Sequence, residues 1–230
     1  MRAIDLLAPP GCGVCLSGHG PVCPQCLQAL SLLTGTLCLR CGMPTAVEVR
    51  ECRRCRGVRL GFSSARAAMA YEGRGRDLVQ AFKDGGQRGL AEHAAALITL
   101  VVPAPDVEAV TWVPADRWRL IGRGYHPPEL LARRLAAAWD VPAGPLLEAH
   151  GRRRPQRGLD LRARRANVRQ AFRASGAAPR RVALIDDVHT TGATLSACSR
   201  VLAAAGAEHV HAVSLARALT GPGRSSRRSV

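Results

Sequence analysis

Aromatic residues and lysine are the scarcest components of this chain. Phenylalanine, tryptophan and tyrosine make up 3% of its 230 residues, so a core must be built from alanine, leucine and valine. So few aromatic rings also argue against a stacking platform for single-stranded nucleic acid. Lysine occurs once, as Lys83, among 33 basic residues. Because arginine is the usual cation of this chain, a lysine kept at one position indicates a site that needs a compact ammonium group.

The chain also lacks a long apolar run. Its longest such stretch, residues 94–102, is too short to span a bilayer. The first ten residues are too short for an export signal and are interrupted by Asp5 and two prolines. These features predict no membrane insertion and a cytoplasmic location. In a reducing cytoplasm, nine cysteines favour metal binding over disulfide bonds.

Acidic residues are too few to balance the basic ones, and the net charge is +16. Such a charge predicts attraction to polyanions, either nucleic acid or a highly phosphorylated ligand. Arginines cluster at residues 152–154, 162–165 and 224–228. The alternative is solvated charge that arises from a compositional bias toward arginine.

Eight of the nine cysteines form four Cys-x-x-Cys pairs. The pairs are Cys12/Cys15, Cys23/Cys26, Cys38/Cys41 and Cys52/Cys55. Two pairs complete one tetrahedral site, so the sequence predicts two structural zinc ions. Chain order joins the first two pairs and the last two, while a crossed pairing, a redox role for one pair and an iron–sulfur cluster stay open. Residues 1–60 hold too little apolar material to fold without metal. Cys52→Ser is therefore expected to unfold this module and to leave the ligand site of the C-terminal third, described next, largely intact.

A strand, an acidic pair and a hydroxyl-rich loop follow one another in the C-terminal third. Four apolar residues at 182–185 predict a buried strand that ends at Asp186 and Asp187, and a loop at 190–194 then leads into a helix. Backbone N–H groups and the helix dipole favour an anion at such a loop. The aspartates can accept from sugar hydroxyls or help to hold Mg²⁺. A ribose 5-phosphate suits both the anion-binding loop and the acidic pair. The alternative interpretation is an ordinary strand end before a capped helix.

The remaining chain alternates between strand and helix patterns, which predicts an α/β fold with a parallel sheet. The expected strands are 65–71, 110–113, 182–185 and 210–215, and the expected helices are 77–83, 90–100, 130–139 and 194–205. Ligands bind such sheets at the carboxyl ends of the strands. The predicted organisation is a double zinc ribbon at 1–60, an α/β domain at 61–220 and a disordered basic tail at 221–230.

Several segments carry a resemblance to known proteins. Residues 182–194 resemble the phosphoribosyl pyrophosphate (PRPP) signature of type I phosphoribosyltransferases, although His189 stands where an aliphatic residue is usual. The other matching segments are Tyr71-Glu72-Gly73 with Leu78 and Lys83; Val113-Pro114, Arg123-Gly124-Tyr125 and 129–132; and Pro155-Gln156, Gly158-Leu159, Arg164, Arg165, Asn167 and Ala171-Phe172. With the cysteine pairs, these segments resemble the ComF family almost end to end. In that family zinc ribbons precede a phosphoribosyltransferase domain, and it is linked to natural competence for DNA uptake. Residues 126–128 depart from the family, since His-Pro-Pro replaces Asn-Gln-Ala.

This resemblance implies a type I phosphoribosyltransferase fold, and a Mg²⁺- and PRPP-dependent phosphoribosyl transfer to an unknown acceptor. The residues implied to bind PRPP are Asp186, Asp187, Thr190, Thr191, Gly192, Ala193, Thr194, Lys83, Pro114 and Arg117. The residues implied in catalysis are Asp186, Asp187, Arg123 and Arg165, the last within an arginine-rich stretch at 152–165 that suits a mobile lid. The alternative function is a non-catalytic PRPP-binding or nucleic-acid-associated module. Such a module would contact single-stranded DNA, a helicase or other DNA-uptake proteins.

Overall fold

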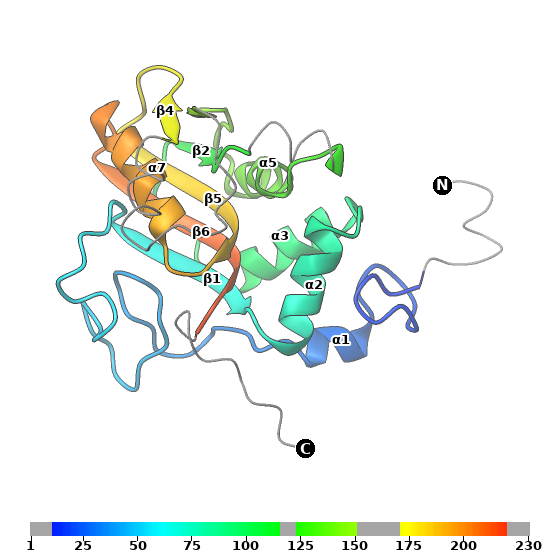
Figure 1. Cartoon of the computed structure of the whole chain (residues 1–230). Helices are drawn as coiled ribbons and strands as arrows, with labels where there is room; N and C mark the ends of the chain where they lie inside the picture. Colours follow the sequence, from blue (N-terminus) through cyan, green and yellow to red (C-terminus); the bar gives the residue numbers. More distant parts are fainter. Residues whose placement is uncertain (1–10, 116–122, 151–170, 220–230) are drawn as a thin grey trace, which may run out of the picture.

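The computed structural model describes residues 11–115, 123–150 and 171–219. Its centre is a parallel four-stranded sheet with the order β1-β6-β5-β2 (Figure 1). The strands are β1 (Ser64–Ala70), β2 (Ala109–Trp112), β5 (Arg181–His189) and β6 (His209–Arg217). The sheet is parallel because a helical crossover follows β1, β2 and β5 and returns the chain to the same edge.

Helices cover both faces of the sheet. The helices α2 (Gly73–Lys83), α3 (Leu90–Val101) and α5 (Pro127–Trp139) lie on one face, and α7 (Ala193–Ala204) lies on the other (Figure 1). Successive side chains of β5 point to opposite faces of the sheet, because side chains alternate along a strand. Ala183 and Ile185 pack with α2, α3 and α5, whereas Val182 and Leu184 pack with α7. This burial on both faces explains the unbroken apolar run that predicted the strand.

A short antiparallel pair lies beside α7. It joins β3 (Leu147–Ala149) to β4 (Phe172–Ala174), and the N–H of His150 donates to the carbonyl of Ala171 at 2.8 Å. The arginine-rich stretch at 152–165 falls between these strands in sequence and lies outside the described residues. The chain therefore leaves the described fold at His150 and re-enters it at Ala171, two residues that are hydrogen-bonded to each other.

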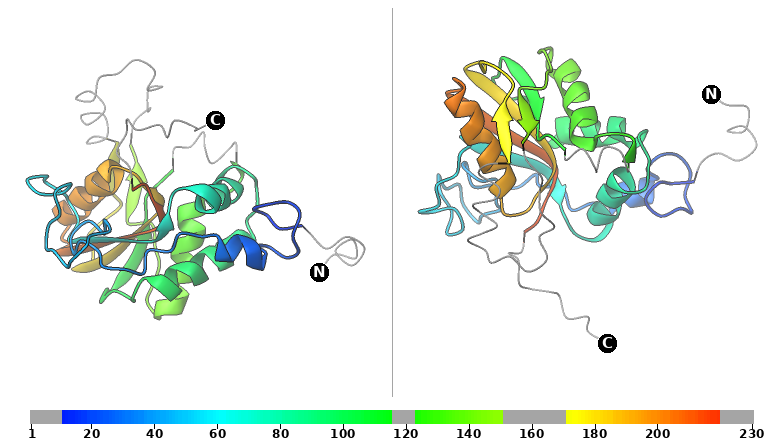
Figure 2. Two further views of the ribbon diagram at one scale, coloured as in Figure 1. Left: turned by 90° about the horizontal axis from the view of Figure 1, so that it is seen from below. Right: turned by 45° about the horizontal axis from the view of Figure 1, so that its top comes forward.

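The cysteine-rich module wraps one edge of the sheet. Its first cluster lies beside α1 (Pro24–Gln28) and α2, and its second cluster lies at the opposite end of the molecule (Figures 1 and 2). The linking segment runs along β1, where the N–H of Leu33 donates to Ala68 and the N–H of Ala70 donates to Ser31. An edge strand that is paired in this way offers no free edge to another chain.

The expected fold is confirmed, with differences in detail. The central strand continues through Asp186 and Asp187 to His189, four residues beyond its predicted end, because β6 also continues and pairs Arg217 with His189. The helix α2 begins at Gly73 rather than at residue 77, and α5 begins at Pro127 rather than at residue 130. The β3–β4 pair has no counterpart among the predicted strands. Of the helices in the described ranges, none combines the length and apolarity that a bilayer crossing requires. The domain boundaries at 60 and 220 remain predictions, and the predicted tail at 221–230 lies outside the described residues.

Candidate functional site

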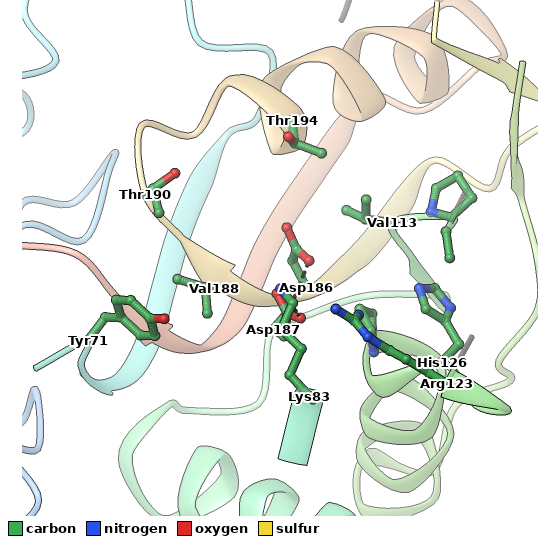
Figure 3. A pocket seen from close by; sticks show the side chains of 13 residues that line it. Tyr71, Lys83, Val113, Arg123, His126, Asp186, Asp187, Val188, Thr190 and Thr194 are labelled. Carbon is green, nitrogen blue, oxygen red and sulfur yellow. Dashed lines mark hydrogen bonds and ion pairs between the residues drawn. The ribbon is translucent and has the colours of Figure 1, made fainter. Parts of the chain in front are cut away.

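A cavity of about 310 Å³ opens at the carboxyl ends of the strands (Figure 3). Residues from β5, α2, α5 and α7, from the loops that follow β1, β2 and β5 and from the segment before α5 share its wall. They are Tyr71, Lys83, Val113, Pro114, Ala115, Arg123, His126, Pro128, Asp186, Asp187, Val188, Thr190 and Thr194. Loop threonines lie on one side of the aspartates, and Lys83, Arg123 and His126 lie on the other (Figure 3).

The acidic pair is held by two different contacts. Asp187 is buried, and its Oδ2 lies 2.7 Å from Nζ of Lys83, which reaches it from the last turn of α2. Asp186 is half-buried, and its Oδ1 accepts the N–H of Asp187 at 2.9 Å. The lone lysine of the chain thus places a compact positive charge directly against the acidic pair.

The loop at 190–194 brings backbone N–H groups to the cavity rim. Gly192 is the N-cap of α7 and has a φ of 75°, and its carbonyl accepts the N–H of Ser196 at 2.8 Å. The hydroxyl of Thr191 accepts the N–H of Ala193 at 3.3 Å. The first N–H groups of a helix have no partner inside it, and the helix dipole adds positive potential there. The loop therefore has the features of an anion site.

Gly192→Ala is expected to strain this loop. An alanine at a φ of 75° costs roughly 1–3 kcal/mol, and its Cβ would lie 2.8 Å from Nε2 of His189. We expect a fall of roughly 5 °C in Tm together with weaker binding of phosphate compounds, measured by calorimetry. Gly176→Ala is the matched control, since nothing lies within 4 Å of the added Cβ. An equal effect of both changes would contradict the role given to Gly192.

The opposite wall carries Arg123 and His126. The guanidinium of Arg123 donates to Oδ1 of Asp84 at 2.7 Å. Burial lowers the pKa of His126 below its ordinary value, against the opposing effects of Glu129 and Asp187. The imidazole of His126 is therefore neutral near pH 7, and a neutral imidazole can accept a proton from a bound molecule.

The structure brings seven of the sequence-predicted residues into the cavity wall. They are Lys83, Pro114, Arg123, Asp186, Asp187, Thr190 and Thr194. Thr191, Gly192 and Ala193 shape the loop behind this wall, whereas Arg117 and Arg165 lie outside the described residues. His189, which departs from the PRPP signature, is 3% exposed and absent from the wall. Burial, together with the charge of Arg217, lowers the pKa of His189 to about 3.

The sequence did not assign Tyr71, His126 or Pro128 to the site, nor Val113, Ala115 and Val188 of the wall. Tyr71 follows β1 directly, so the rule that pointed to Asp186 could also have found it, since both lie at a carboxyl end of a parallel strand. His126 carried no comparable signal, because the approach of α5 to the aspartates depends on tertiary packing.

The cysteines form two groups of four, in chain order. Cys12, Cys15, Cys23 and Cys26 make the first group, and Cys38, Cys41, Cys52 and Cys55 make the second. In the second group, Sγ–Sγ distances are 3.6 Å between Cys41 and Cys52, 3.7 Å between Cys38 and Cys55, and 3.8 Å between Cys52 and Cys55. Four thiolates at about 2.3 Å from a tetrahedral zinc lie about 3.8 Å apart. This geometry fits zinc and excludes the crossed pairing.

Backbone N–H groups favour the thiolate form of some cysteines in each group, whereas burial raises the pKa of Cys26, Cys41 and Cys55. The N–H groups of Ser17 and Gly18 lower the pKa of Cys15 to about 6. Burial opposes ionisation of Cys38, but the N–H groups of Cys41 and Cys52 outweigh it and lower the pKa of Cys38 to about 7. Because thiolate is the form that binds zinc, each group has donors suited to a structural metal.

Comparison with known proteins agrees with this arrangement. Residues 3–56 match the family model of the double zinc ribbon domain. Competence protein F of Haemophilus influenzae is 34% identical over 153 residues, which are 61% of this chain and 67% of that protein. This chain belongs to the ComF family. Another ComF relative, DNA utilization protein YhgH of Escherichia coli K12, is 28% identical over 233 residues, covering 93% of this chain and all of that protein.

Among solved structures, this ComF protein is similar to phosphoribosyltransferases. The glutamine PRPP amidotransferase of B. subtilis matches 56% of the chain at 22% identity with a TM-score of 0.36, and the chain spans 26% of that protein's length. Adenine phosphoribosyltransferase from Thermoanaerobacter pseudethanolicus matches 54% of the chain at 15% identity with a TM-score of 0.34, over 67% of its own length. The ComF chain joins a double zinc ribbon to a domain built on a parallel four-stranded sheet.

Proposed function

We propose that this protein binds PRPP with Mg²⁺ and transfers its phosphoribosyl group to an acceptor, within the handling of DNA during competence in the cytoplasm. The observation that carries the proposal is one cavity lined by the acidic pair, the threonine loop and Lys83. The names of the relatives, competence protein and DNA utilization protein, support the process but not the chemistry.

PRPP has three parts, and the cavity offers a group for each. The loop at 190–194 suits the 5-phosphate, since it combines N–H donors with a helix N-terminus. Asp186 and Asp187 suit the ribose hydroxyls or Mg²⁺. Lys83 and Arg123 supply cations for the pyrophosphate. Arg117 and Arg165, which lie outside the described residues, are proposed to add to them.

The reaction would break the bond between C1 of the ribose and the pyrophosphate oxygen. Positive charge develops on the ribose ring and negative charge on the leaving group, so cations at the pyrophosphate stabilise the transition state. Mg²⁺ would supply further charge neutralisation, and the carboxylates of Asp186 and Asp187 have the donor chemistry to hold it. His126 lines the same cavity in its neutral form, so it can accept the proton that the acceptor loses.

The test is a calorimetric titration of PRPP with and without Mg²⁺, followed by an assay of pyrophosphate release over a panel of nucleobases and amines. Saturable, Mg²⁺-dependent binding with release for one class of acceptor supports the proposal. Binding without release for any acceptor supports the non-catalytic PRPP-binding alternative. Absence of PRPP binding would contradict both the transferase proposal and the non-catalytic PRPP-binding alternative.

Exposed arginines on the second ribbon favour a second candidate function, a contact with single-stranded DNA. Arg50, Arg53, Arg56 and Arg59 are all exposed and lie within ten residues of one another. The phosphate backbone attracts such a cluster without regard to sequence. The arginines at 152–154, 162–165 and 224–228, which lie outside the described residues, are proposed to add to this surface.

DNA affinity is expected to fall steeply with salt, and less steeply once the ribbon arginines are removed. Each single-strand phosphate contact contributes about −0.7 to the slope of log affinity against log salt, so four arginines changed to glutamine should flatten the slope by about 3. Fluorescence anisotropy at several salt concentrations measures it. The control changes Arg74, Arg133, Arg134 and Arg180, which are also exposed. Equal slopes for the two variants would assign the charge to compositional bias. If the arginines at 152–165 bind both DNA and pyrophosphate, PRPP with Mg²⁺ should compete with DNA.

A further inference from the structure

Arg217 is a buried cation at the end of β6. It is 3% exposed, and its Nη1 donates to the carbonyl of Cys41 at 2.5 Å and to Nδ1 of His189 at 2.7 Å. Cys41 belongs to the second four-cysteine group, whereas His189 is the last residue of β5, three positions before Gly192. One guanidinium therefore contacts both a zinc ribbon and the strand that carries the acidic pair.

The contact continues from His189 to the anion-binding loop. Nε2 of His189 lies 2.8 Å from the position that a Cβ would take on Gly192, so the ring lies directly behind the loop. Phe62 holds the ring from a second side, edge to face with a centroid separation of 6.0 Å. The same Nη1 also lies 3.2 Å from Nε2 of His189. Because a guanidinium can only donate, the ring nitrogen that takes this hydrogen bond must be unprotonated, and the contact restrains the orientation of the ring. The position of Arg217 thus determines where the support of the loop lies.

The second ribbon is fixed to the sheet by its backbone next to Cys41. The N–H of Ala65 donates to the carbonyl of Arg40 at 2.9 Å, and a Cβ on Gly42 would lie 2.3 Å from the carbonyl oxygen of Ala65. The buried residues of this ribbon's own cluster are its four cysteines. Without an apolar core of its own, this ribbon would depend on metal to keep its fold, and so to keep the carbonyl of Cys41 against Arg217.

We propose that Arg217 is a positioning residue that couples the second zinc ribbon to the anion-binding loop at 190–194. Metal in the second ribbon fixes Cys41, Cys41 fixes Arg217, and Arg217 fixes His189 behind Gly192. Loss of this metal then weakens phosphate binding at the loop. The coupling rests on the proposed PRPP site, and it replaces the expectation that Cys52→Ser leaves that site largely intact.

The first ribbon provides a matched comparison because it contacts a different part of the domain. Its Gly13 carbonyl accepts a hydrogen bond from Gln87 at 3.3 Å, and its cysteines pack with Leu78 and Phe82 of α2. Ribose 5-phosphate is the suitable probe, since it lacks the pyrophosphate that Lys83 on α2 is proposed to bind. Loss of the first metal should therefore leave the affinity for ribose 5-phosphate unchanged.

The binding experiment uses the full-length protein and calorimetry with ribose 5-phosphate. We expect Arg217→Gln to lower the affinity about tenfold, as for loss of a charged hydrogen bond, with both metals retained. Arg180→Gln, an exposed arginine paired with Glu208, should have no effect. Cys52→Ser should lower the affinity, whereas Cys15→Ser should not. In the Arg217→Gln background, Cys52→Ser should cause little further loss of affinity. If the losses of binding free energy from Cys52→Ser and Arg217→Gln simply add in the double variant, the coupling is overturned.

A spectroscopic measurement keeps the proposal testable if Arg217→Gln folds poorly. The imidazole ¹⁵N signals of His189, identified by their loss in His189→Gln, report the tautomer and its hydrogen bond. In the Cys15→Ser protein, a chelator should shift these signals as the second metal leaves. Unchanged signals would overturn the coupling even if PRPP binds. Failure of the wild-type protein to bind PRPP with Mg²⁺ or ribose 5-phosphate would instead reject the proposed function, while the His189 signals still decide whether ribbon and strand are coupled.

Discussion

Replacing Asp186 and Asp187 together with asparagine is expected to weaken Mg²⁺-dependent PRPP binding at least about 100-fold. The double change keeps the shape of the cavity floor but removes two carboxylates. Two hydrogen bonds to charged groups contribute about 1.5–3 kcal/mol each, which corresponds to a loss of about two or more orders of magnitude. Calorimetry with PRPP and Mg²⁺ measures the change.

This result separates a ribose or metal site from a simple attraction of phosphate to positive charge. Without the two carboxylates, Lys83 loses its partner Asp187 and the cavity becomes more positive. A site that bound PRPP by charge alone would then bind it more tightly. Asp77→Asn with Asp106→Asn is the matched control, because both residues are absent from the cavity wall. Tighter or unchanged binding in the Asp186/Asp187 variant would show that the ribose lies elsewhere.

Local patterns account for what the sequence predicted well. The acidic pair, the loop and the start of α7 lie within ten consecutive residues, so their proximity is fixed by the chain itself. The cysteine groups are similarly local, since each Cys-x-x-Cys spacing places two thiolates on one metal. The fold class followed from alternating apolar strands and amphipathic helices, whose periods are also properties of short segments.

Features that depend on packing between distant segments were missed. Arg217 has the sequence context of a solvated arginine, yet its Nη1 contacts Cys41, 176 residues away. The β3–β4 strands are three residues each and are separated by 22 residues, too short for a periodic signal. The extension of β5 to His189 depends on its pairing with β6, which no local pattern encodes.

Removal of metal is expected to unfold the second ribbon completely. Its buried apolar cluster consists of Cys38, Cys41, Cys52 and Cys55, with Met43, Val49 and Leu60 only partly buried beside them. No core remains there once the thiolates lose their common ligand. The first ribbon differs, because Val22 and Leu30 pack into the larger cluster with α2 and α3. Structural zinc contributes about 10–16 kcal/mol in small zinc-dependent folds, more than the few partly buried side chains of the second ribbon can replace.

Elemental analysis should therefore find two zinc ions per chain, and hydrogen exchange should report their loss region by region. After chelation, we expect amide protection to vanish in residues 36–60, to fall partially in 11–33 and to persist in β5 and β6, the central strands of the sheet. Partial retention in 11–33 is required because its apolar side chains belong to the domain core. Iron in place of zinc, or about one metal per chain, would reject the two-ribbon interpretation. Protection of residues 36–60 that survives chelation would show that packing against Ala65 and Arg217, rather than metal, holds the second ribbon.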